Sequence, residues 1–142
     1  MNRVYNNEAL IMACIVHLLR RRNMDMPISY IMVTLLIDNQ LGAIIRKSQN
    51  FEELSDLISN QGLISRKLAS FGPYFINAMV ILKQSKVIDI SDDVVQLIDD
   101  SFPDENLRSK RLDRIIKDAH VLLDMCSNLS SKEIYNKLNV HL

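Results

Sequence analysis

The sequence has few residues that break a helix and no excess of charge of either sign. Its 142 residues include no Trp, 3 Gly and 3 Pro, whereas hydrophobic residues make up 48%. So little Gly and Pro disfavours both disorder and a β-sandwich and favours tightly packed helices. The 17 basic and 17 acidic residues balance, whereas a protein that binds nucleic acid by itself usually has a strong basic excess. Any contact with DNA is therefore expected to be local.

The usual motifs of catalysis and cofactor binding are also missing. His17 and His120 have no Cys or second His three or four residues away, so no metal site has a familiar spacing. The chain has no GxxxxGK phosphate-binding loop, no GxSxG and no glycine-rich dinucleotide loop. The carboxylates cluster in predicted turns without an adjacent His. We expect a protein that is not an enzyme and that uses no cofactor, metal ion or small-molecule substrate.

The cysteines and the apolar runs indicate the compartment. Cys14 and Cys126 are far apart in apolar helical patterns, which predicts buried free thiols rather than a disulfide. Arg20, Asp25 and Asp38 interrupt the apolar stretches, so none reaches the roughly 18 to 20 residues that a membrane span needs. The N-terminus does not resemble a signal peptide. We expect a cytoplasmic protein without membrane contact, folded as one helical domain over residues 1–142.

The first predicted helix is apolar on nearly every face over residues 9–16, with Asn6 or Asn7 as its cap. Such a helix belongs in the centre of a domain or in an interface. We therefore expect Ile11 or Ile15, whichever faces away from the core of the domain, to be covered by a partner or by a second copy of the chain.

The end of this helix and the next segment continue the helical pattern. Arg20, Arg21 and Arg22 suit the negative end of a helix dipole, and a DNA-binding patch is the less favoured interpretation. Pro27 stands at a plausible first helical position before ISYIMVTLLIDN, whose length favours a helix over a buried strand. Residues 40–49 are predicted to be a link.

The middle of the chain predicts three short helices. Asn50 and Glu53 form a capping-box pattern before the first of them, and a turn at Gln61 and Gly62 precedes the second. Gly72 and Pro73 are predicted to separate the second from the third, PYFINAMVILKQSK.

A β-hairpin is predicted directly after these helices. Residues 87–90 and 94–98 are two short runs rich in β-branched residues on either side of an acidic turn. The alternative is a short capped helix over 91–101.

Three helices and a two-stranded wing are the order of a winged helix. We expect a winged-helix-like part over about residues 50–99. A wing that tracks phosphates is expected to be basic, but this region is acidic, so we expect Asp92 and Asp93 to bind a partner protein. The acidic residues of the region are Asp89, Asp92, Asp93, Asp99, Asp100, Asp104 and Glu105.

The last third predicts C-terminal helices over about residues 103–138. Apolar residues at steps of three and four define one side of a long helix, and Ser130 with Glu133 again forms a capping-box pattern before a short one. The stripe consists of Leu112, Ile115, Ile116, Ala119, Leu122, Leu123 and Cys126. The fold class is therefore mainly α, with a winged-helix-like core, one short hairpin and a long C-terminal helix.

Lys110, Arg114 and Lys117 fall on the opposite side of the long helix. A solvated face is the ordinary explanation of such charges. The second explanation is a ridge that contacts the DNA backbone, and these three residues are the candidates for that contact.

Four blocks of sequence, in order, resemble the middle component of ABC three-component systems, of which the Lamassu type of bacterial anti-phage and anti-plasmid defence is the best known. The blocks are VYNNEALIMACIVHLLRR, MPISYIMVTLLIDNQLGAIIRKS, the hairpin, and IIKDAHVLLDMCSNLSSKEIYNKLNVHL. The resemblance implies a non-enzymatic adaptor that bridges an SMC-like ABC ATPase and an effector, often a nuclease. It also implies that the adaptor helps hold the effector inactive until foreign DNA is sensed, and that DNA is contacted only within the complex.

A second hypothesis belongs to another class of protein. A small winged-helix transcriptional regulator acting as a homodimer would use the turn before Ser65, Arg66 and Lys67 to place these residues near a DNA groove. The balanced charge and the acidic hairpin favour the adaptor.

Overall fold

The computed structural model describes residues 3–102 and 109–140, which form seven helices and three short strands. In chain order these are α1 (Arg3–Arg21), β1 (Met24–Asp25), α2 (Met26–Ile37), α3 (Asn39–Lys47), α4 (Phe51–Gln61), α5 (Leu63–Gln84), β2 (Ile88–Ser91), β3 (Val94–Leu97), α6 (Lys110–Met125) and α7 (Ser131–Leu138). The predicted helix-rich class is confirmed. No single helix of the described ranges is long and apolar enough to cross a membrane; α2 and α3 meet that test only together, and the chain bends by 88° between them.

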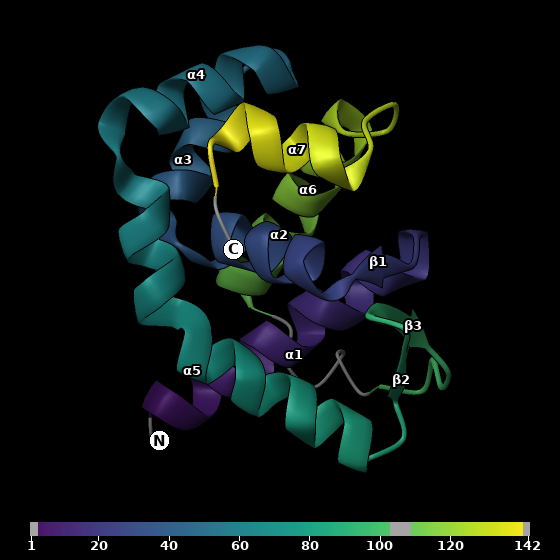
Figure 1. Ribbon diagram of the computed structural model, residues 1–142. Coiled ribbons are helices and arrows are strands. Elements are labelled where there is room, and N and C mark those ends of the chain that lie inside the picture. Colours follow the sequence, from purple (N-terminus) through teal and green to yellow (C-terminus); the bar gives the residue numbers. More distant parts are fainter. Residues whose placement is uncertain (1–2, 103–108, 141–142) are drawn as a thin grey trace.

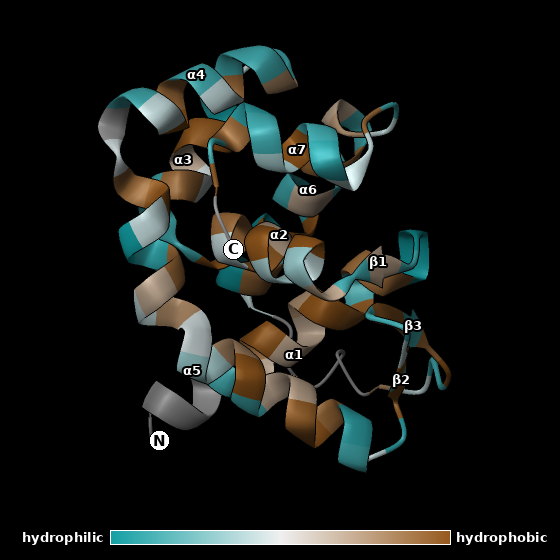
Figure 2. Ribbon diagram, viewed as in Figure 1, coloured by the Kyte–Doolittle hydropathy of each residue, from teal (hydrophilic) through white to brown (hydrophobic). Residues whose placement is uncertain are grey.

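Helix α2 lies at the centre of the molecule (Figure 1), in contact with α1, α3, α5 and α6. Nine of its twelve residues are buried, and Figure 2 shows hydrophobic residues along most of its length. Asp25 caps it by accepting a hydrogen bond from the backbone N–H of Ile28, and Pro27 lies in the first turn, where a missing N–H costs nothing. The prediction of a helix rather than a strand is confirmed.

Helix α1 is part of the same core. It packs against α2, α5 and α6, and Ile11 and Ile15 are each only 1% exposed. The expectation that one of them contacts a partner is corrected, because helices of this chain already cover both side chains. The helix also begins at Arg3, so Asn6 and Asn7 lie inside it and do not cap it.

The three strands form one antiparallel sheet in the order β1-β3-β2. Ile88 pairs with Leu97 and Ser91 with Val94, which confirms the predicted hairpin and excludes the alternative short helix. The two turn residues, Asp92 and Asp93, have φ angles of 53° and 64°. These left-handed values are typical of the tight turn that suits the twist of a hairpin. Strand β1 was not predicted.

Residues 40–49, predicted as a link, mostly belong to helix α3. Asp38 caps this helix by accepting a hydrogen bond from the N–H of Leu41. Gly42 lies where α3 approaches α6, since a Cβ there would be 3.6 Å from the Asp118 carboxylate. Gly42 therefore belongs to a contact between helices rather than to a loop.

The predicted break at Gly72 and Pro73 is also wrong. Helix α5 continues through both residues and bends about halfway along its length (Figure 1). The cap at Asn50 and the left-handed turn at Gly62, with φ 60°, are confirmed. Two helices, α4 and α5, therefore precede the hairpin instead of the three expected.

The C-terminal helices follow the predicted pattern. Six of the seven stripe residues are buried and the seventh, Ile116, is half-buried. Ser109 caps α6, and the capping box of Ser130 and Glu133 is confirmed at α7. The segment 103–108, expected to start the long helix, lies outside the described residues. Both cysteines are buried free thiols, as predicted.

Candidate protein-docking surface

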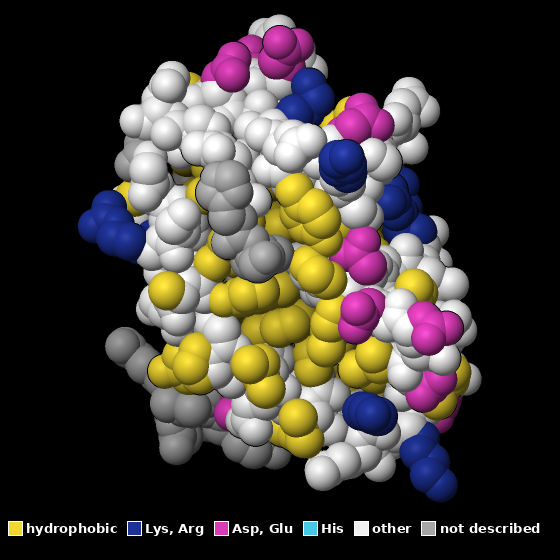
Figure 3. Space-filling model, in the orientation of Figure 1, with side chains coloured by type: hydrophobic (Ala, Val, Ile, Leu, Met, Phe, Trp, Pro, Cys, Tyr) yellow, Lys and Arg dark blue, Asp and Glu magenta, His cyan; other side chains and the backbone are white. Residues whose placement is uncertain are grey.

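An apolar groove runs between α2 and the bend of α5. Its volume is about 320 Å³, and its lining residues are Met26, Pro27, Tyr30, Gly72, Phe75 and Ile76. Figure 3 shows hydrophobic side chains gathered across the middle of this face. Ile76 is 62% exposed, and Val80, one turn further along α5, is 45% exposed. Scattered apolar surface residues are ordinary, but a continuous apolar hollow marks an interaction site.

The groove exists because α5 is bent and has no side chain at Gly72. Pro73 has no N–H, so the helix lacks one hydrogen bond at this level. The hydroxyl of Tyr30 donates a hydrogen bond to the carbonyl of Leu68 in the turn before the bend. A Cβ at Gly72 would lie 3.0 Å from the Tyr30 hydroxyl, tighter than an ordinary contact. Gly72 thus leaves the space that Tyr30 occupies.

The Tyr30 ring is held from a second side. It stacks on Phe75 with ring centroids 5.0 Å apart and planes 24° apart. Burial raises the pKa of the Tyr30 hydroxyl above its ordinary value of 10.0, so the group stays protonated and donates at neutral pH. The floor of the groove is therefore formed by two aromatic rings, and these contacts fix their positions.

One end of the groove is acidic. The N–H of Met26, a lining residue, donates to the carbonyl of Asp93 at 2.7 Å, which joins the hairpin turn to the groove. The side chains of Asp92 and Asp93 are exposed there, as the sequence predicted. Asp25 lies at the same end and accepts hydrogen bonds from Ile28 and from the hydroxyl of Tyr135, at 2.8 and 2.9 Å. Acidic side chains border the apolar area on the side of the sheet (Figure 3).

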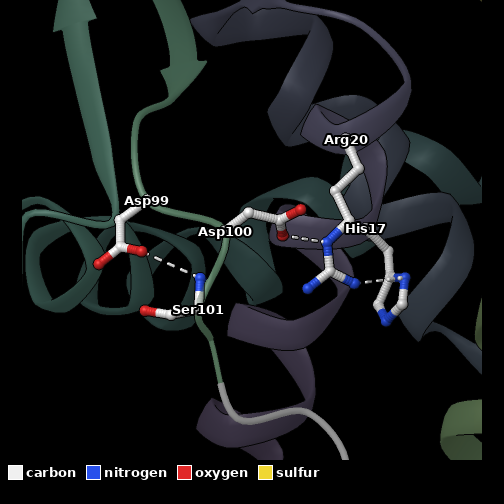
Figure 4. Close-up of polar contacts among 5 residues, drawn as sticks. All are labelled: His17, Arg20, Asp99, Asp100 and Ser101. Atoms are coloured by element: carbon white, nitrogen blue, oxygen red, sulfur yellow. Dashed lines mark hydrogen bonds and ion pairs between the residues drawn. The ribbon is translucent and has the colours of Figure 1, made fainter.

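Other acids of the hairpin region have separate roles. Asp100 accepts a hydrogen bond from Nε of Arg20, whose guanidinium also contacts the ring of His17 at 3.4 Å (Figure 4). Asp99 accepts a hydrogen bond from the backbone of Ser101, and its contacts with Ser101 lower the pKa of the Asp99 carboxyl. The acids predicted as one cluster therefore divide into two groups, and Asp104 and Glu105 fall outside the described residues.

The arginines at the end of α1 contact side chains from other parts of the chain. Besides the pair of Arg20 with Asp100, Arg21 donates to Asp124 at 2.9 Å and lies 2.8 Å from Nδ1 of His120. These contacts attach α1 to α6 and to the segment after the hairpin. They disfavour the interpretation of the triplet as a DNA-binding patch.

The three DNA-backbone candidates are not equivalent. Lys110 and Lys117 are exposed, but Arg114 is half-buried and donates to the side-chain oxygen of Asn39 at 3.1 Å. Arg114 therefore connects α6 to the start of α3 and is less free than the two lysines to contact phosphates. Lys110 and Lys117 remain candidates for a contact with phosphates.

A second hollow, of about 260 Å³, lies beside the junction of α2 and α3. Lys67 is part of its wall and pairs with Asp38 at 3.0 Å, so one of the residues assigned to the alternative DNA contact is already engaged. Within the described ranges, no group of three or more His, Cys, Asp or Glu residues is arranged to hold a metal ion.

Comparison with known proteins adds no further assignment: no family model, curated protein or solved structure matches this chain. The candidate site therefore rests on its own geometry. Sequence reasoning found the acidic turn but missed the groove. The available signal was the width of the apolar face of α5, which includes Ile76 and Val80 as well as the buried Phe75 and Met79.

Proposed function

We propose that this chain is a non-enzymatic adaptor that binds other proteins through the groove between α2 and α5. The observation that carries the proposal is an exposed apolar hollow, with Ile76 62% exposed, next to three carboxylates. Apolar contacts supply affinity when water is expelled, and charges at the edge orient the partner and speed its encounter.

The proposed assembly is an ABC three-component defence complex of the Lamassu type. This part of the proposal rests on the resemblance of the sequence blocks. The adaptor would bridge an SMC-like ABC ATPase and an effector, often a nuclease, and help control the activation of the effector when foreign DNA is sensed. DNA would be contacted only within the complex, where Lys110 and Lys117 would lie along the phosphate backbone.

The winged-helix comparison also belongs to the proposal. The hairpin follows a long helix, as a wing does, and its acidic tip supports a role in docking proteins. The alternative of a homodimeric winged-helix regulator has less support, because Asp92 and Asp93 occupy the tip and Lys67 is paired with Asp38.

Copurification tests the adaptor. The tagged chain is expressed together with the products of the neighbouring reading frames, and the captured proteins are identified by mass spectrometry. We expect an ABC ATPase and an effector in stoichiometric amounts. A chain that purifies alone as a dimer and binds isolated duplex DNA, with affinity that falls steeply with salt, would contradict the adaptor and support the regulator.

A further inference from the structure

The acids at the end of the groove have no basic partner among the described residues. Among the described residues, Asp25, Asp92 and Asp93 take part in no ion pair, although Asp25 accepts two hydrogen bonds. Four other aspartates, by contrast, each lie within 3.0 Å of an arginine or lysine nitrogen: Asp38, Asp100, Asp118 and Asp124. The negative charge at the groove is therefore not neutralised by the chain itself.

The shape of the turn does not require this charge. Asp92 and Asp93 have φ angles of 53° and 64°, a conformation that Asn adopts as readily as Asp. The hairpin would form equally well with the neutral residue Asn at both positions. The charge is thus available for an interaction outside the chain.

The groove itself is uncharged along its length. Its six lining residues are apolar, aromatic or Gly, so charge is confined to the end next to the sheet. A second copy of this chain fits poorly, because in a two-fold contact the same patch meets itself and no basic residue lines the groove to face the acids. A volume of about 320 Å³ between two helices suits the side chains of one face of a third helix.

We infer that the groove binds an amphipathic helix of a partner protein, with apolar residues seated between α2 and α5 and Lys or Arg residues facing Asp25, Asp92 and Asp93. This inference rests on the proposed function and names the chemistry of the partner segment. The apolar residues of the helix cover Ile76, and its basic residues supply the positive charge that the aspartates lack as a partner.

Two labelled peptides test the inference on the full chain. Both have the same leucine face at helical spacing, and their flanking positions carry Lys in one peptide and Glu in the other. Binding is measured by fluorescence anisotropy at low and high salt. We expect the Lys peptide to bind roughly 3- to 10-fold more tightly at low salt, and this preference to shrink at high salt.

Three variants separate the apolar from the charged contribution. Asp92→Asn with Asp93→Asn keeps the turn and should remove most of the preference for the Lys peptide. Ile76→Ser should weaken binding of both peptides roughly 10-fold or more. Ile98→Ser is the matched control, because Ile98 is 56% exposed but does not line the groove. It should bind both peptides like the wild type.

Each contrary result has a distinct meaning. Equal binding of the two peptides by the wild type, lost in Ile76→Ser, would overturn the assignment of a basic helix while leaving an apolar docking groove. Failure of both peptides to bind would overturn the inference altogether. A wild-type dimer in light scattering that becomes a monomer in Ile76→Ser would identify a second copy as the occupant and would also overturn it. None of these outcomes depends on copurification of the ATPase, which tests the adaptor separately.

Discussion

The contact between α3 and α6 provides the sharpest prediction about stability. Nη1 of Arg46 lies 2.6 Å from Oδ2 of Asp118, whose side chain is only 3% exposed, while that of Arg46 is 41% exposed. Arg46→Met keeps most of the aliphatic stem and removes the charge. Loss of one partner of a fully buried ion pair costs about 3 to 5 kcal/mol, and the exposure of Arg46 reduces this to about 2 kcal/mol. The melting temperature should fall by roughly 4 to 8 °C.

The pH dependence of the free energy of unfolding tests the same contact in a second way. Burial raises the pKa of Asp118 above its ordinary value of 3.8, and the charge and hydrogen bond of Arg46 act against burial. The folded chain therefore binds more protons than the unfolded chain between the two pKa values. The free energy of unfolding should fall as the pH rises from about 4 through the raised pKa. In Arg46→Met the pKa rises further, so the fall should extend to higher pH.

Asp118→Asn is the matched control, because its amide oxygen still accepts a hydrogen bond from Arg46 and carries no charge. This variant should stay within about 1 kcal/mol of the wild type and lose the pH-dependent fall. In its background, Arg46→Met removes only a neutral hydrogen bond and should cost about 1 kcal/mol, less than in the wild type. Urea denaturation over a pH series measures all four proteins. Equal stability of Arg46→Met and the wild type at every pH would refute the buried ion pair.

Three further predictions concern the core, the groove and the basic residues of α6. Ile15→Asp places a charge in the core and should leave the chain unfolded by circular dichroism; a folded variant would contradict the position of α1. Tyr30→Phe removes the donor to the Leu68 carbonyl and should lower the free energy of unfolding by about 1 kcal/mol in urea; no change would mean that this bond does not support the bend. Lys110→Glu with Lys117→Glu should change stability by less than about 0.5 kcal/mol, yet weaken DNA binding by the assembled complex. Identical affinities across a salt series would assign these lysines to a solvated face.

Features with a local cause could be predicted from the sequence. The cap at Asn50 and the capping box of Ser130 and Glu133 depend on residues three positions apart. The hairpin depends on two β-branched runs around a turn that accepts left-handed φ angles. The helix break expected at Gly72 and Pro73 was wrong, because tertiary contacts outweigh the local preference of these two residues for ending a helix. A proline costs the helix one hydrogen bond, and the contacts of Tyr30 with Leu68 and Phe75 hold α5 on both sides of the bend.

The features that could not be predicted depend on which helices and strands pack against one another. The two residues of β1 are too few to show a sequence period, and they become a strand only by pairing with β3. Ile15 and Ile76 are chemically the same residue on apolar helices, yet one is 1% and the other 62% exposed. Neighbouring helices cover the side of α1 that carries Ile15, whereas they leave the side of α5 that carries Ile76 open. The groove is for this reason a property of the packing of α2 against α5.

The most direct test of the adaptor is the affinity of the chain for the purified ATPase and for the purified effector, measured separately. Ile76→Asp and Ile98→Asp place the same charge at residues that are 62% and 56% exposed, but only Ile76 lines the groove. We predict that Ile98→Asp binds both partners like the wild type. Ile76→Asp should bind one partner about 30-fold more weakly and keep its affinity for the other, with an unchanged melting temperature. Unchanged affinity of Ile76→Asp for both partners would contradict docking through the groove.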